Sequence, residues 1–136
     1  MPASTYERDN RLNRFRGTAT PAVPASHFIS LHSADPGLTG ASELTGNAYA
    51  RVAVSSAVGS WGAPAVNGAV RQITNTNLIS FPAATPAAWS AATHFGVWDA
   101  ATVGNFIRGN ALDAAKTAGI GDNIKFDAGT LILNEQ

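Results

Sequence analysis

Short segments in which hydrophobic and polar residues alternate run through most of the chain, and this alternation predicts β-strands. In residues 27–33, Ile29 and Leu31 fall on one face of such a strand, while Phe28 and Ser30 fall on the other. Further alternating or apolar segments occupy residues 49–55, 70–73, 78–81, 93–98, 105–109, 123–126 and 130–133. Turns rich in Gly, Pro, Asn and Asp separate these segments. The pattern therefore predicts an all-β fold, an antiparallel β-sandwich of jelly-roll or immunoglobulin-like type.

Two segments between the predicted strands do not show a clear alternation. Residues 59–68 are rich in Gly and Pro, and we expect them to form a connection rather than a strand. Residues 111–118 have helical propensity, but the segment is short and is followed by Gly119 and Gly121. We expect a strand ending or a loop there.

The N-terminal residues carry a different signal, that of a short helix. Ser4 and Glu7 have the spacing of a capping box, and Gly17 is placed to end the helix. Because its apolar residues are few, this helix would be marginal in isolation. We interpret residues 1–25 as an N-terminal helix and Pro-containing arm that lies on its own domain or on a neighbouring subunit, with a solvated helix as the alternative. Residues 26–136 then form the sandwich domain.

Composition and charge narrow the class of protein. Nine basic residues balance nine acidic ones, which argues against a nucleic-acid-binding protein. The absence of cysteine excludes disulfides and cysteine-based metal sites. No apolar run is long enough for a transmembrane helix, and the N-terminal segment is too polar for a secretion signal, so we expect neither membrane insertion nor secretion by that route. A surface with little charge suits contact with other protein, or is simply polar and uncharged.

No metal site is predicted from the three histidines. His27 and His32 are five residues apart on one predicted strand, so their side chains point to opposite faces. His94 belongs to another strand and can meet one of them, but no third ligand is marked by its spacing.

No catalytic or cofactor-binding residue is predicted either. Asp35 and Glu43 lie near one loop, as a glycosidase pair would, but Asp35 precedes a proline and turn formation accounts for it better. The Gly119–Gly121 pair lacks the features of a phosphate loop. The oxygen donors Asp122, Asn123 and Asp127 are spaced more like a polar β-turn than a calcium loop.

The candidate interaction residues lie in the N-terminal helix and in one loop. Four of the seven arginines are in the helix: Arg8, Arg11, Arg14 and Arg16. Their guanidinium groups suit pairing with carboxylates of another protein. Trp61 lies in a Gly/Pro loop, where an aromatic side chain suits a subunit contact, with core packing as the alternative.

Two blocks of sequence resemble a known family. The first is LHSADPG (residues 31–37), followed by Thr39-Gly-Ala41, Glu43 to Gly46 and Tyr49-Ala-Arg51. The second is THFGVWDAAT (residues 93–102), followed by Gly104-Asn105 and Gly109. Together they resemble small tailed-bacteriophage proteins labelled tail fibre protein, from about Ser4 to Leu133. The Ala-rich residues 85–93 and the Asn-Thr-Asn stretch at 75–77 depart from the family in loops.

The resemblance implies a non-enzymatic structural protein of the virion, assembled in the host cytoplasm. Among such roles, a rigid domain with a reaching arm favours a capsid decoration (cement) protein bound to the major capsid protein or other virion subunits. The alternative is a tail fibre or distal-tail component that contributes to host adsorption; a small hydrolase acting on the cell envelope is a third class. A homotrimer follows from family analogy and from the three-fold sites of a shell.

Overall fold

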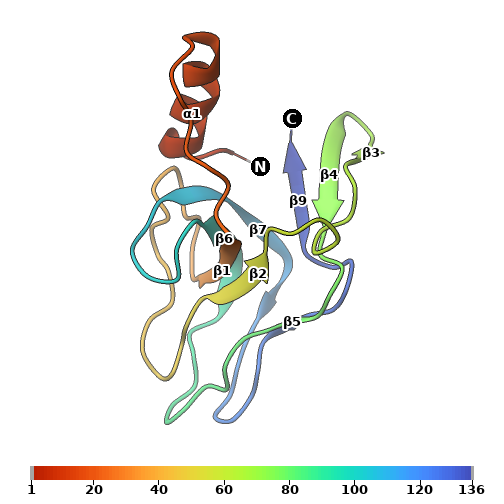
Figure 1. Cartoon of the computed structure of the whole chain (residues 1–136). Helices are drawn as coiled ribbons and strands as arrows, with labels where there is room; N and C mark the ends of the chain where they lie inside the picture. Colours follow the sequence, from red (N-terminus) through yellow and green to blue (C-terminus); the bar gives the residue numbers. More distant parts are fainter. Residues whose placement is uncertain (1, 136) are drawn as a thin grey trace.

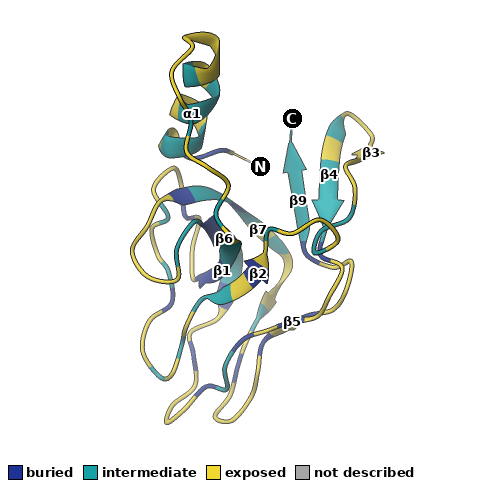
Figure 2. Cartoon of the chain, viewed as in Figure 1, coloured by how far each residue is buried: buried dark blue, intermediate teal, exposed yellow. Residues whose placement is uncertain are grey.

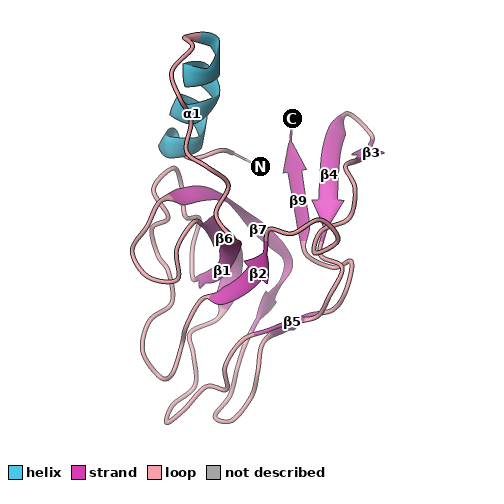
Figure 3. Ribbon diagram, in the orientation of Figure 1, coloured by secondary structure: helices cyan, strands magenta, loops and turns pink. Residues whose placement is uncertain are grey.

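The computed structural model describes residues 2–135. Within that range the chain forms one helix, α1 (Thr5–Phe15), followed by short strands (Figures 1 and 3). The strands are β1 (Ser26–His32), β2 (Val52–Ser55), β3 (Ala65–Asn67), β4 (Val70–Thr74), β5 (Ile79–Ser80), β6 (Ala92–Trp98), β7 (Phe106–Lys116), β8 (Lys125–Phe126) and β9 (Ile132–Glu135).

Antiparallel sheets build the body, as the alternation predicted. The largest sheet has the strand order β2-β1-β6-β7, a second has the order β3-β4-β9, and β5 pairs with β8. All of these pairings are antiparallel. The all-β class with a short N-terminal helix is therefore confirmed.

The main core lies on the inner face of the four-stranded sheet. Ile29 and Leu31 of β1 are fully buried there, and they lie opposite Val97 and Phe95 of β6. Leu131 and other apolar side chains from the strands and loops of the smaller sheets cover this face. Figure 2 shows the buried positions gathered in the middle of the body, while the loops and the helix are mostly exposed.

The opposite face of the same sheet is buried as well, which a simple alternation does not predict. Ser30 and His32 are as inaccessible as their neighbours Ile29 and Leu31. The loop that follows β1 covers this face, since the backbone of Ser33 binds that of Ser42 and Gly40 lies against Trp98. The first block of the family resemblance therefore lies over the sheet.

Two strand predictions were incomplete. The return strand expected at residues 105–109 continues as β7 to Lys116, because β6 offers hydrogen-bond partners along its whole length across two register shifts. The segment 59–68, expected to be a connection, contains β3, whose short pairing with β4 holds it in the second sheet. The alternation of hydrophobic and polar residues is weak in both segments because their side chains are exposed to solvent. Every residue of β3 is exposed, and so are several residues of β7.

Helix α1 is fixed to the body at its N-terminal end. The Ser4 side chain accepts a hydrogen bond from the Glu7 backbone N–H at 3.1 Å, so the predicted cap is present. The Ser4 backbone N–H donates to Ile107 of β7 at 2.9 Å. From this anchor α1 points away from the sheets, and the following linker runs back to β1 (Figure 1). No described residue of α1 is buried.

Candidate functional site

The blocks that carry the family resemblance meet in a buried cluster around Arg51. Its guanidinium group binds both carboxylate oxygens of Glu43 at 2.8 Å, and it donates to the backbone carbonyls of Ala100 and Val103 at 2.9 and 2.8 Å. It also lies 3.7 Å from the centre of a Trp98 ring. Only 8% of the Arg51 side chain and 18% of the Glu43 side chain are exposed. Arg51, which belongs to the first block, is thus bound to Trp98 and to the hairpin turn after β6, where the second block ends.

A second part of the cluster joins Ser30, His32 and Trp98. Trp98 Nε1 donates to Ser30 Oγ at 2.9 Å, and Ser30 Oγ lies 2.7 Å from His32 Nε2. The other ring nitrogen of His32 is 2.6 Å from the carbonyl oxygen of Ala41. Burial lowers the pKa of His32, so this imidazole is neutral at pH 7. A serine beside a histidine suggests a nucleophile and its base, but both are fully buried and the third group is a carbonyl.

The glycines of these blocks allow the close packing. A Cβ at Gly40 would come within 2.4 Å of the Trp98 ring, and a Cβ at Gly109 within 2.6 Å of Pro36. Gly96 is enclosed in the same way by Ser30 and other buried side chains. The motif residues therefore build a rigid scaffold, and their chemistry serves packing and hydrogen bonding.

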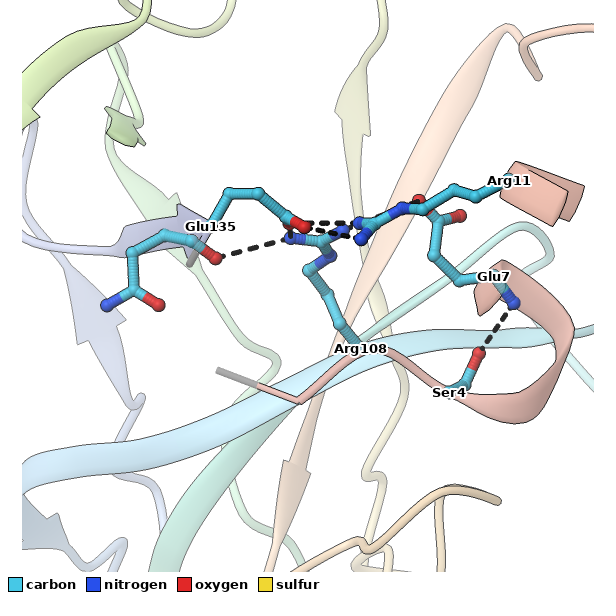
Figure 4. A network of polar contacts seen from close by, with 6 residues as sticks. Ser4, Glu7, Arg11, Arg108 and Glu135 are labelled. Carbon is cyan, nitrogen blue, oxygen red and sulfur yellow. Dashed lines mark hydrogen bonds and ion pairs between the residues drawn. The ribbon is translucent and has the colours of Figure 1, made fainter. Parts of the chain in front are cut away.

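An ion-pair network fixes α1 to the last strand (Figure 4). Arg11 and Arg108 both bind the carboxylate of Glu135, with 2.9 Å between Arg11 Nη2 and Glu135 Oε2. Glu7 closes the network, because it accepts from Arg11 Nε at 3.2 Å and from Arg108 Nη2 at 3.4 Å. Arg108 also donates to the Asn134 carbonyl at 3.2 Å. Residues from α1, β7 and β9 are thereby held together.

The network predicts a dependence of stability on pH. Partial burial opposes ionisation of Glu135, but hydrogen bonds and attraction from Arg11 and Arg108 outweigh it and hold the pKa of Glu135 below its ordinary value. A carboxyl whose pKa is lowered on folding stabilises the protein above its unfolded pKa of about 4.3, and this contribution is lost as the pH falls through the folded pKa.

We therefore expect Glu135→Gln to lower the free energy of unfolding at pH 7 by up to about 1 kcal/mol, because the pair is partly exposed. The difference from the wild-type protein should shrink as the pH falls below the unfolded pKa and through the lowered folded pKa of Glu135. Urea unfolding at several pH values measures it. An Asp127→Asn variant, changed at an exposed carboxyl outside the network, is the control; a constant Glu135→Gln difference from pH 7 to pH 3 would contradict the prediction.

The four arginines expected to make contacts are placed differently from one another. Arg11 is engaged within its own chain, as described above. Arg8, Arg14 and Arg16 are exposed, and none of them forms an ion pair within residues 2–135. The Arg16 side chain makes a single long hydrogen bond, in which Nη1 donates to Asn13 Oδ1 at 3.5 Å. Three guanidinium groups, two on α1 and one at its C-terminal cap, are thus open to solvent.

Trp61 lies at the wall of a cleft between the two larger sheets. It is half-buried, packs against the core and forms an isolated bridge with Asn75. The cleft has a volume of about 370 Å³, and its lining is largely apolar. Its apolar lining residues are Val23, Trp61, Pro64, Ile73, Val97, Ile107 and Leu133. Arg108 and Glu135 also line it, so the cleft opens beside the base of α1.

Candidate catalytic and metal-binding residues do not come together. Asp35 accepts from the Gly37 backbone in a turn at 2.8 Å, while Glu43 is bound by Arg51. His32 and His94 are paired across β1 and β6, but both ring nitrogens of His32 are occupied by Ser30 and Ala41. Within residues 2–135, no group of three or more His, Cys, Asp or Glu side chains is arranged to hold a metal.

Several residues of the site were missed in the sequence. Arg108 lies in a predicted strand, and Glu135 lies just beyond the last predicted strand. The contact between Glu135 and Arg11 of α1 joins residues that are 124 positions apart in the chain. Arg51 and Arg108 could have been found from the sequence, because each is a lone arginine in a predicted strand of apolar or small residues. A charged side chain in a buried strand needs a partner.

These features define a class: a β-structural protein with an exposed N-terminal helix and an apolar cleft. The family described as Podophage GP4 fiber I protein gp80 matches residues 2–134. The chain belongs to this family and is a non-enzymatic structural fibre component of a phage virion. A comparison with curated proteins finds no match. None of the described helices is long and apolar enough to span a membrane.

Proposed function

We propose that this protein is a fibre subunit that attaches to the virion through α1 and contributes to host adsorption. The family match carries the proposal, since it names a fibre protein over nearly the whole chain. It favours the fibre interpretation over capsid decoration, which had been our first expectation. A homotrimer and contact with the major capsid protein remain predictions.

The two ends of the molecule support a division of roles. Helix α1 and the hairpin of β3 and β4 lie at one end, and the loops after β5 and β7 reach the other end (Figure 1). Arg8, Arg14 and Arg16 give the α1 end open cationic groups that suit carboxylates of other virion subunits. The loops at the other end are then free to face the host surface.

Charge reversal on α1 tests this proposal. In phage that carry Arg14→Glu and Arg16→Glu, we expect roughly tenfold fewer copies of the protein per particle, because two attractive contacts become repulsive. The number of copies is measured by quantitative mass spectrometry of purified particles. The matched control is Lys116→Glu with Lys125→Glu, two basic residues of β7 and β8 outside α1.

Adsorption and binding experiments with the same phage particles distinguish a fibre subunit from a capsid decoration protein. Particles that lack the protein should adsorb to host cells more slowly if it is part of the adsorption apparatus. Normal incorporation of the Arg14/Arg16 variant would contradict attachment through α1. Protein that stays on tailless capsids would instead support capsid decoration.

A further inference from the structure

A second cleft is lined mainly by polar side chains, in contrast to the apolar cleft beside Trp61. Strands β7 and β9 are the edge strands of their sheets, and both line this polar cleft. Its volume is about 360 Å³, within the range of pockets that bind small ligands. Its polar lining side chains are Asn67, Gln72, Asn110, Asp113, Lys116, Thr130 and Asn134.

The carboxamide groups of the polar cleft have hydrogen-bonding capacity that the protein does not use. Asn134 Oδ1 is buried and has no hydrogen-bond partner within residues 2–135. Gln72 Oε1 accepts from Asn67 Nδ2 at 2.9 Å, and the Gln72 amide hydrogens have no acceptor in the described chain. The side chain of Asn110, which is half-buried, makes no hydrogen bond there either. Because buried polar groups are nearly always paired, these groups point to a ligand with donors and acceptors of its own.

The charges of the polar cleft favour a neutral ligand. Asp113 and Lys116 contribute one negative and one positive charge to the lining, which is therefore neutral overall. Neither side chain forms an ion pair within residues 2–135. The Lys116 ammonium group lies 5.1 Å from the centre of the Phe126 ring. A nucleic acid or another polyanion would require an excess of cationic groups, which this cleft lacks.

A molecule rich in hydroxyl groups matches this lining best. Each hydroxyl both donates and accepts hydrogen bonds, as a carboxamide does. The half-buried Leu112 adds an apolar surface suited to the C–H groups of a sugar ring. An extended peptide is the competing ligand, because β7 and β9 are edge strands. Such a peptide is bound mainly through backbone groups and pockets for alternate side chains, so it would leave the unpaired carboxamides of Asn110 and Asn134 unexplained.

We propose that the polar cleft binds a neutral saccharide, whose hydroxyl groups are hydrogen-bonded by the carboxamides of Gln72, Asn110 and Asn134. The terminal side-chain torsions of Asn and Gln are soft, so these groups can turn to meet the ligand. The proposal deepens the proposed role in host adsorption and rests on it for the source of the saccharide, a host surface polysaccharide. The last residues of β7 line the cleft and lead into a loop at the end that we assign to the host (Figure 1).

The first test measures saccharide binding to the purified full chain. Glucose, galactose, mannose, rhamnose, N-acetylglucosamine and purified host surface polysaccharide are titrated separately, while nuclear magnetic resonance follows the backbone and side-chain amide signals. At least one of these saccharides should bind and shift the carboxamide signals of Asn110 and Asn134. A short peptide of alternating Thr and Val is the probe for an added strand. If no saccharide shifts these signals, or if only the peptide does, the proposal is overturned.

The second test uses substitutions that separate ligand binding from a structural role. In Asn134→Leu, we expect the Kd for the bound saccharide to rise roughly tenfold. The melting temperature should not fall, because an apolar group of similar shape replaces a buried acceptor that has no partner in the described chain. Asn110→Ala should weaken binding in the same way. The matched control is Asn77→Ala, an exposed asparagine outside the cleft, which should bind like the wild type. An unchanged Kd in both cleft variants overturns the proposal.

The outcomes distinguish this proposal from the proposed function. If a saccharide binds in the cleft but particles that lack the protein adsorb normally, the cleft is a saccharide site and the role in adsorption is wrong. If no saccharide binds and such particles adsorb slowly, the role in adsorption stands and the cleft proposal is wrong. Free host polysaccharide should slow the adsorption of wild-type phage more than that of Asn134→Leu phage. Equal slowing would overturn the host polysaccharide as the ligand of this cleft.

Discussion

Substitution of Arg51 by Met should destabilise the protein by about 4 kcal/mol, the cost of breaking a buried ion pair by removing one partner. The change leaves the Glu43 carboxylate almost buried without its cation, and it frees the carbonyls of Ala100 and Val103. The free energy of unfolding in urea measures the loss. Because domains of this size are only marginally stable, we expect a poorly folded protein at 37 °C.

Two further variants show whether the lost pair is the cause. Arg71→Met removes an exposed arginine whose only side-chain hydrogen bond within the described chain is to Pro64, and it should cost less than about 1 kcal/mol. Glu43→Gln combined with Arg51→Met removes the uncompensated charge and should recover part of the stability. Equal losses for Arg51→Met and Arg71→Met would show that the cluster does not stabilise the fold.

The second large effect is expected at Gly96, where even a methyl group has no room. In Gly96→Ala, the new Cβ would lie 2.6 Å from Ser30 Oγ, 2.7 Å from His32 Nε2 and 2.8 Å from a carbon of the Phe106 ring. All three neighbours are buried, so none can move aside without disturbing the sheet. We expect a loss of about 3 kcal/mol, typical of severe overpacking in a core.

Gly62→Ala is the matched control for this substitution. Its Cβ would meet only Thr74, at an ordinary distance of 3.6 Å, so stability should change by less than about 1 kcal/mol. Thermal unfolding of the two variants measures the difference. If both variants melt at the same temperature, the motif glycine is not required for close packing.

The sequence predicted the elements whose signals are local. Alternation in residues 27–33 and 93–98 located β1 and β6, because each strand has an apolar face turned to the core. Ser4 and Glu7 located the start of α1 by their spacing. These signals are contained within a few residues, so they need no knowledge of the tertiary fold.

The contacts that build the site could not be predicted in this way. The Arg11–Glu135 pair joins the two ends of the chain, and no local pattern records such a partner. All four helix arginines were expected to pair with another protein, whereas Arg11 pairs with Glu135 of its own chain. Trp61 was left open between contact and core; it is half-buried at a cleft wall, a position that combines features of both.

The double fixation of α1 has a mechanical consequence. A force on the outer end of the helix is carried along two paths. One is the covalent linker that enters β1 at Ser26. The other consists of the hydrogen bond of Ser4 to β7 and the ion pair of Arg11 with β9. The covalent path leads into β1, which is hydrogen-bonded on both sides by β2 and β6. A force applied to the outer end of the helix would therefore reach an interior strand of the sheet, while the ion pairs can break and re-form under load.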